Sequence, residues 1–144
     1  MPRILVTGSR SWTDRKTLSW ALTQTCIDHG WMVEPDEYGN TVPRGDVVVV
    51  HGGAQGADTM ADDWAAGSIV RTEIHFADWR RHGRRAGPMR NRAMVEAGAD
   101  VCLAFLLPCS RPDCERSAAP WSPGASHCAS PAEKAGIPVR RVEG

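Results

Sequence analysis

Short apolar runs alternate along the chain with segments whose apolar residues recur every three to four positions. The apolar runs predict strands at about residues 4–6, 47–50, 70–76, 101–107 and 138–142. The helical period lies between them, over about 14–29, 57–65, 87–97 and 131–135. Strands that alternate with helices predict a Rossmann-like α/β fold of three layers, in which a mostly parallel sheet has helices on both faces.

Capping and turn residues set the expected helix ends. Thr13 is the expected N-cap of the first helix, which closes at Gly30. Gly87 and Pro88 open the third helix, and Gly98 ends it. Residues 34–45 hold two prolines and two glycines, which is typical of a loop or a small hairpin.

The size and charge of the chain limit its class. A chain of 144 residues, 42% of them hydrophobic, predicts a single domain over residues 1–144, with an irregular, cysteine-containing insertion at about 107–125. No apolar run approaches the ~20 residues of a membrane span, and the first residues lack a signal-peptide layout, so a cytoplasmic protein without membrane contact is expected. A net charge of zero gives no overall attraction to nucleic acid.

The five cysteines leave two interpretations open. An odd number without a secretion signal argues against a disulfide framework. A candidate set of structural zinc ligands occurs late in the chain: Cys109, Cys114, His127 and Cys128. Their spacing is wider than that of most zinc knuckles, which favours thiols without a metal in an irregular insertion. Cys26 and Cys102 occupy core positions of a helix and a strand. Zinc is the one cofactor that the sequence suggests.

Two glycine turns follow predicted strands, at residues 7–10 and 51–58. In parallel sheets, ligands bind beyond the carboxyl ends of the strands, where glycines let backbone amides approach a phosphate. The second turn is not a P-loop, because no Gly-Lys-Ser/Thr follows it. The predicted ligand-binding residues are Gly8, Ser9, Arg10, Gly52, Gly53, Ala54, Gly56, Asp58, Arg90 and Asn91.

A third segment, residues 79–92, holds six arginines. The helical period predicts that Arg90 shares a stripe with Ala93, Met94 and Ala97, which places it at the ligand edge of the sheet. The remaining cluster is interpreted as a solvated face, with contact to nucleic acid as the alternative. It consists of Arg80, Arg81, Arg84 and Arg85.

These motifs occur together, and in order, in one known family. They are Gly8-Ser9-Arg10 with Trp12, the turn at 51–58, and Trp79 with Gly83, Ala86-Gly87, Arg90-Asn91 and Met94. In these residues the chain resembles the YspA-type, cpYpsA-related branch of the SLOG superfamily, over about residues 3–107 and again at 135–139. The resemblance implies a pocket for a nucleotide or nucleotide derivative. We interpret the chain as a sensor or binding module, and because SLOG relatives commonly dimerise, a homo-oligomer is expected.

The relatives differ in activity, so alternatives stay open. The Lonely Guy phosphoribohydrolases cleave an N-glycosidic bond, and DprA/Smf binds single-stranded DNA. The first relationship makes Arg90 a candidate catalytic residue of a nucleotide hydrolase. Asp58, in the first turn of the helix after the glycine loop, is the candidate acid or base. The late turn at 122–128 lacks the glutamate that those hydrolases carry, which favours binding over hydrolysis. Nucleic-acid binding through the arginine cluster is the third interpretation.

Overall fold

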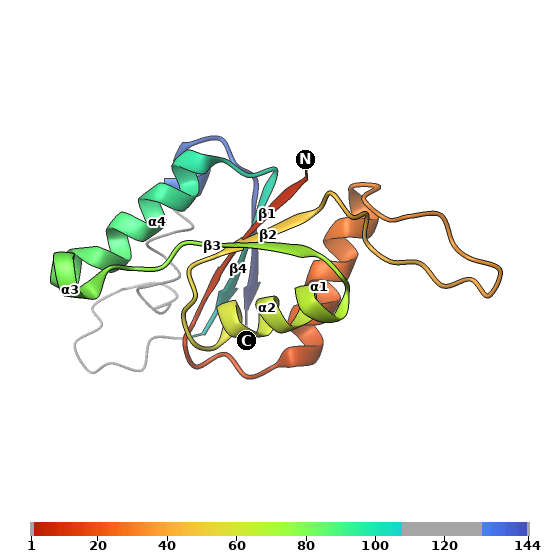
Figure 1. Ribbon diagram of the computed structural model, residues 1–144, viewed down its shortest axis with the longest axis horizontal. Coiled ribbons are helices and arrows are strands. Elements are labelled where there is room, and N and C mark those ends of the chain that lie inside the picture. Colours follow the sequence, from red (N-terminus) through yellow and green to blue (C-terminus); the bar gives the residue numbers. More distant parts are fainter. Residues whose placement is uncertain (1, 108–130, 144) are drawn as a thin grey trace.

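The computed structural model describes residues 2–107 and 131–143, which form a five-stranded sheet with helices (Figure 1). The strands are β1 (Arg3–Gly8), β2 (Val48–His51), β3 (Arg71–Ile74), β4 (Val101–Leu106) and β5 (Val139–Glu143). They lie in the order β3-β2-β1-β4-β5, and each neighbouring pair is parallel. The predicted Rossmann-like α/β fold is confirmed.

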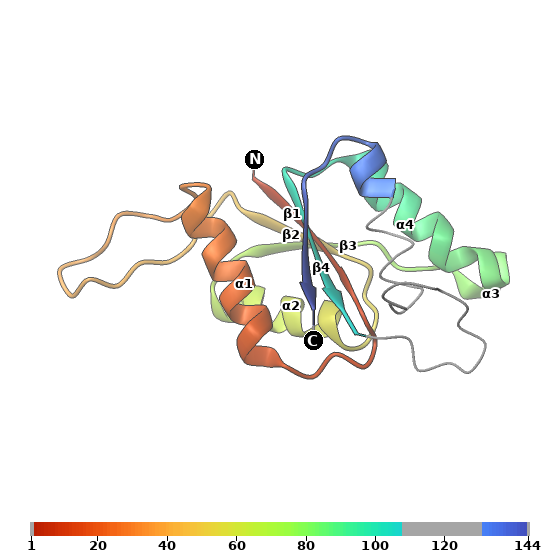
Figure 2. The same cartoon turned by 180° about the vertical axis from the view of Figure 1, so that it is seen from behind.

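Helices cover both faces of the sheet (Figures 1 and 2). Helices α1 (Arg15–Asp28) and α2 (Ala57–Gly67) pack on one face, and α4 (Ala86–Ala97) lies on the other with a helical turn at residues 131–134. Consecutive strand residues point to opposite faces, so Leu5 belongs to a different core cluster from its neighbours Ile4 and Val6. Both faces of β1 are therefore buried.

The first helix begins one residue later than the sequence suggested. Asp14 is the N-cap, not Thr13, and its carboxylate accepts hydrogen bonds from the backbone N–H of Thr17 at 3.1 Å and from its hydroxyl at 2.6 Å. A carboxylate accepts both bonds and also complements the positive end of the helix dipole, which a threonine hydroxyl cannot do. The helix ends at Asp28, and Gly30 follows in a left-handed conformation with φ of 71°.

The secondary structure of residues 79–97 differs more from the prediction. A short helix, α3 (Trp79–His82), and a 3₁₀ turn (Gly83–Arg85) precede α4, which already begins at Ala86. The predicted stripe is also rotated, because Ala93 and Ala97 are exposed while Met94 and Val95 are buried. Burying these larger side chains removes more apolar surface from water than burying two alanines would.

The segment between α1 and β2 is a hairpin-like arm that projects from the sheet (Figure 1). Met32 and Pro43 form an antiparallel bridge, and the Val33 amide donates to the Val42 carbonyl at 2.9 Å. Of the two interpretations of residues 34–45, the structure supports the hairpin. It lies at the opposite end of the molecule from α3 and contributes nothing to the pocket described below.

Arg3, Glu73 and His75 form an ion-pair cluster between β1 and the end of β3. The Arg3 guanidinium contacts both Glu73 carboxylate oxygens, at 2.6 and 3.1 Å, and the His75 Nε2 lies 2.7 Å from Oε2. Hydrogen bonds from Arg3 and then His75 lower the pKa of Glu73 from 4.5 to about 2. The carboxylate therefore stabilises the fold above pH 4.5, and this contribution disappears as the pH falls toward 2.

We predict that Glu73→Gln lowers the free energy of unfolding by about 1 kcal/mol at pH 7, because the pair is partly exposed and screened by solvent. At pH 3 the difference from the wild type should shrink, because Glu73 in the unfolded chain is then protonated and must lose its proton when the protein folds and the ion pair forms. Urea unfolding at the two pH values measures both differences. An equal loss at pH 7 and pH 3 would assign the effect to packing instead of charge.

Candidate functional site

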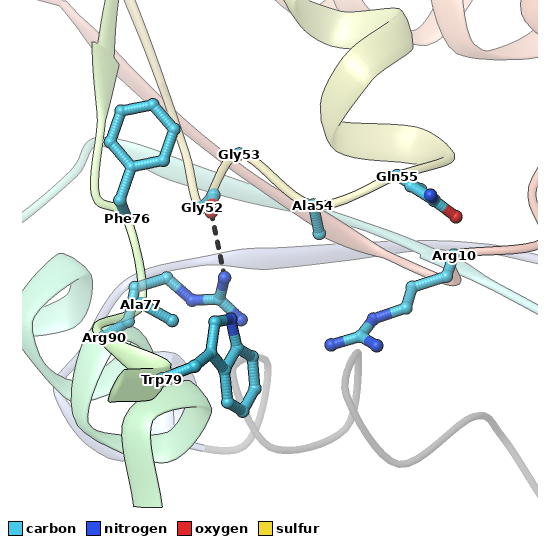
Figure 3. Close-up of a pocket in the computed structure, with 9 residues that line it drawn as sticks. All are labelled: Arg10, Gly52, Gly53, Ala54, Gln55, Phe76, Ala77, Trp79 and Arg90. Atoms are coloured by element: carbon cyan, nitrogen blue, oxygen red, sulfur yellow. Dashed lines mark hydrogen bonds between the residues drawn. The ribbon is translucent and has the colours of Figure 1, made fainter. Parts of the chain in front are cut away.

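Three loops meet beyond the carboxyl ends of β1, β2 and β3 and form a half-open pocket of about 400 Å³ (Figure 3). This volume lies within the ~300–1,000 Å³ range of small-molecule sites. The loop after β1, the glycine turn after β2, the segment after β3 and helix α4 all contribute to it. The lining residues are Arg10, Gly52, Gly53, Ala54, Gln55, Phe76, Ala77, Trp79 and Arg90.

Arg90 reaches from α4 across the end of β2. Its Nη1 donates to the Gly52 carbonyl at 2.9 Å, and its Nε donates to Asn91 Oδ1 at 3.0 Å (Figure 3). A Cβ atom on Gly52 would lie 2.7 Å from the Arg90 Cδ and Nη1 atoms. Glycine at position 52 is therefore what allows the guanidinium to lie against the turn, and Arg90 points over the strand ends.

Arg10 enters the pocket from the other side, out of the loop after β1. Its Cζ atom lies 6.0 Å from the centre of the Trp79 ring, a cation–π contact. Within residues 2–107 and 131–143, neither Arg10 nor Arg90 forms a salt bridge. Among the residues that the structure describes, none that lines the pocket is acidic. The pocket therefore carries two positive charges, which suits an anionic ligand.

The glycine turn itself differs from the expected phosphate cradle. The amides of Gly52 and Ala54 donate to Asp58 Oδ2, at 3.0 and 3.3 Å, and the Gly53 amide donates to His51 Nδ1 at 3.0 Å. Three consecutive backbone donors are thus engaged by protein atoms. The part of the chain that the structure describes offers no acceptor to the amides of Gln55 and Gly56, just before α2. Gln55 lines the pocket and Gly56 does not, so the Gln55 amide is the donor available to a phosphate at the amino end of α2.

Asp58 and His51 hold the turn from beneath. Asp58 is 6% exposed, and burial raises its pKa, opposed by the hydrogen bonds from the Ala54 and Gly52 amides and by the charges nearby. Because the Gly53 amide donates to His51 Nδ1, the ring hydrogen is on Nε2, which donates to Asp62 Oδ1 at 2.9 Å. Both side chains act on the backbone of the turn, and neither lines the pocket.

Gly8 and Gly56 allow the loop after β1 to lie close to the glycine turn after β2. A Cβ atom on Gly8 would lie 2.6 Å from the Ala57 Cβ, and one on Gly56 would lie 2.6 Å from the Arg10 carbonyl oxygen. Gly56 also has a left-handed φ of 75°. The Ser9 carbonyl accepts hydrogen bonds from the amides of Trp12 and Ala57. These residues support the pocket from behind, and they do not line it.

The ten predicted ligand-binding residues thus fall into two groups. Arg10, Gly52, Gly53, Ala54 and Arg90 line the pocket, whereas Gly8, Ser9, Gly56, Asp58 and Asn91 lie behind it. The prediction missed Gln55, Phe76, Ala77 and Trp79 as lining residues. For Phe76 and Trp79, the available signal was their aromatic side chains at and shortly after the end of the predicted strand 70–76.

The other candidate residues are not among the lining residues of the pocket. The cluster Arg80, Arg81, Arg84 and Arg85 is exposed and outside the lining. Among the described residues, no group of three or more His, Cys, Asp or Glu side chains could hold a metal ion. The candidate zinc ligands Cys109, Cys114, His127 and Cys128 lie outside the described residues, as does nearly all of the predicted insertion, and both stay predictions. Cys26 and Cys102 are buried, as predicted.

Comparison with known proteins agrees with this architecture. Residues 2–82 match the YspA, cpYpsA-related SLOG family. The chain belongs to this SLOG family. It is also 46% identical over 144 residues to the Gene 61 protein of Mycobacterium phage D29, an alignment that covers 96% of this chain and 94% of the phage protein. No solved structure gives a significant match. In the described part of the SLOG chain, no helix is long and apolar enough to cross a membrane.

The matched segment covers most of the pocket but not all of it. It includes both glycine turns, Phe76 and Trp79, and ends at His82, the last residue of α3. Arg90 lies beyond the match, on α4. SLOG membership accordingly supports a nucleotide-related role for the pocket, while the role of Arg90 is inferred from its position alone.

Proposed function

We propose that this SLOG domain is a binding or sensing module for a nucleotide or nucleotide derivative, whose phosphate lies between Arg10 and Arg90. The proposal rests on the convergence of these two arginines in one pocket. Among the described residues, neither arginine has a salt bridge and no lining residue is acidic. Arginine donates paired N–H groups in a planar arrangement that matches phosphate oxygens. The amide of Gln55, for which the described residues offer no acceptor, adds a donor at the positive end of α2.

Hydrolysis of an N-glycosidic bond is the second candidate function, with Arg90 and Asp58 as its catalytic residues. Such a reaction needs a carboxylate that reaches the substrate. Asp58 is buried under the turn and its Oδ2 is occupied by two backbone amides, so the geometry favours binding. Nucleic-acid binding is the third candidate, because the exposed arginines of α3 adjoin the pocket.

Native mass spectrometry of the purified protein tests the proposal most directly. A mass increment that matches a nucleotide or nucleotide derivative, removed by denaturation, is the expected result. The same spectrum reports bound zinc and the number of subunits, which tests the predicted metal site and the expected homo-oligomer. Isothermal titration calorimetry with the common nucleoside 5′-mono- and diphosphates then ranks candidate ligands. A wild-type protein that binds none of them and carries no nucleotide would contradict the proposal.

Gly52→Ala tests the geometry of the pocket with little change to the fold. We expect about tenfold weaker nucleotide binding, equivalent to ~1.4 kcal/mol, because the new methyl group displaces the Arg90 guanidinium. The clash involves a flexible side chain, and Gly52 does not have a left-handed φ, so the variant should fold. Calorimetric titration measures the change in affinity.

Gly67→Ala is the matched control for this substitution. Its added Cβ meets no atom within 4 Å, and its φ is also outside the left-handed region. It should leave affinity unchanged and stabilise α2 slightly. If the two glycine variants bound the nucleotide equally well, the position of Arg90 would not matter for binding.

A further inference from the structure

Two large aromatic side chains stand exposed at the pocket. Phe76, in the segment after β3, is 74% exposed, and Trp79, the first residue of α3, is 50% exposed. Both line the pocket, on the side of the glycine turn where Arg90 lies (Figure 3). Leaving this much aromatic surface in water forgoes the stabilisation that its burial would give. We call Phe76 and Trp79 the aromatic pair.

Each ring of the aromatic pair is positioned by a glycine. A Cβ atom on Gly53 would lie 2.9 Å from Phe76 Cε1, and one on Gly87 would lie 3.3 Å from Trp79 Cη2. The Phe76 ring therefore packs against the glycine backbone of the turn after β2, and the Trp79 ring packs against the glycine backbone of α4. Arg10 adds a third contact, through its guanidinium 6.0 Å from the Trp79 ring centre. The exposed rings are held in place at the pocket by specific contacts.

We infer that the aromatic pair, and Trp79 in particular, binds the base of the nucleotide by stacking, so that the ligand is a base-bearing phosphate and not a sugar phosphate or inorganic phosphate. This inference rests on the proposed function. The cation–π contact places the positive charge of Arg10 beside the indole, which matches a ligand with a flat base and a phosphate close together. Base–aromatic stacking tolerates any base, so Trp79 sets the class of ligand without selecting one base.

The same combination of arginine and aromatic side chains also binds single-stranded nucleic acid. Two observations favour a single nucleotide here. The pocket has a volume of about 400 Å³ and is bounded by three loops, and the aromatic pair and both arginines lie within its lining. The chain as a whole has a net charge of zero, whereas nucleic-acid binding draws on an overall or extended positive surface.

Trp79→Leu tests the inference, with Trp20→Leu as its matched control. Trp20 lies on α1, is 64% exposed and does not line the pocket. The probes are ribose 5-phosphate and the nucleoside 5′-monophosphate that the wild type binds best. We expect Trp79→Leu to weaken nucleotide binding about tenfold or more, the size of one lost stacking contact, and to leave ribose 5-phosphate binding unchanged. Trp79→Phe should retain most of the affinity, and Trp20→Leu all of it.

Calorimetry separates failure of this inference from failure of the proposed function. If Trp79→Leu weakened the binding of both probes equally, the indole would only support the fold of the pocket, and the inference would be overturned. So would a wild type that binds ribose 5-phosphate as tightly as the nucleotide, although the phosphate site would stand. If neither probe bound the wild type, the proposed function and the inference would fall together. Tighter binding of a ten-nucleotide single-stranded DNA, dependent on Trp79, would assign the aromatic pair to nucleic acid and overturn the inference.

Discussion

Replacing Arg90 with alanine should weaken nucleotide binding by about ten- to a hundredfold, the effect of losing one charge-assisted contact of ~1.5–3 kcal/mol. The reason is the position of the guanidinium, which the Gly52 carbonyl and Asn91 Oδ1 hold at the pocket while no described carboxylate neutralises it by a salt bridge. Calorimetric titration of the wild type and the variant with the same nucleotide measures the loss.

Arg92→Ala is the control, because Arg92 lies on the same helix, is exposed and does not line the pocket. It removes the same charge from the protein and should change affinity little. Arg90→Lys keeps the charge but not the planar pair of donors, so it should bind with intermediate affinity. If Arg90→Ala and Arg92→Ala lost affinity equally, binding would depend on a diffuse basic surface, and the nucleic-acid interpretation would replace the nucleotide pocket.

The fold was predictable from the sequence because its signals are local and repeated. Four consecutive valines at 47–50 predict a strand buried on both faces, and Val48, Val49 and Val50 are buried in β2. The α1 stripe of Leu18, Ala21, Leu22, Thr25 and Cys26 is likewise buried, as the period of 3.6 residues requires. The short helix α3 was missed because a single turn has no apolar period, and four of the seven residues from 79 to 85 are arginines.

The site was predictable in place but not in detail. Glycines between a strand and a helix locate the ligand edge of the sheet, yet they do not say which atoms approach each glycine. Gly52 faces Arg90, Gly53 faces Phe76, and Gly56 faces the loop after β1. The residues in each of these contacts are far apart in the sequence, from 23 positions for Gly53 and Phe76 to 46 for Gly56 and Arg10. A local sequence pattern does not encode such contacts. The sequence therefore indicated the glycine turn and Arg90 as ligand-binding, whereas it did not assign the aromatic pair to the pocket.

The role of Asp58 could not be assigned from its position in the sequence alone. At the start of α2, an Asp is expected to cap the helix or serve as a catalytic base. In the structure Gly56 is the N-cap and no side chain caps it, while Asp58 turns back to accept from the Gly52 and Ala54 amides. Asp58 thus holds the backbone of the glycine turn in place as a hydrogen-bond acceptor, and its replacement should strongly lower the stability of the fold.

Asp58→Ala should lower the free energy of unfolding by about 2–4 kcal/mol, because the amides of Gly52 and Ala54 would lose their acceptor beneath the turn. Asp58→Asn should behave differently, since its amide oxygen can take the place of Oδ2 and accept both bonds. Urea unfolding of the wild type and the two variants measures the differences. Equal destabilisation by alanine and asparagine would show that the negative charge, and not the acceptor, holds the turn.

The pH dependence of Asp58→Asn follows from the raised pKa of the aspartate. Burial favours the protonated acid, so this group contributes stability below its ordinary value of 3.8 that is lost as the pH rises through the raised pKa of the folded state. Asparagine does not titrate, so the variant should match or exceed the wild type in stability at pH 7, and that advantage should vanish near pH 3.8. It should also bind nucleotide like the wild type, and chromatography should detect no released base with either protein. Base released by the wild type but not by Asp58→Asn would instead identify Asp58 as a catalytic residue, and the hydrolase would replace the binding module as the function of the pocket.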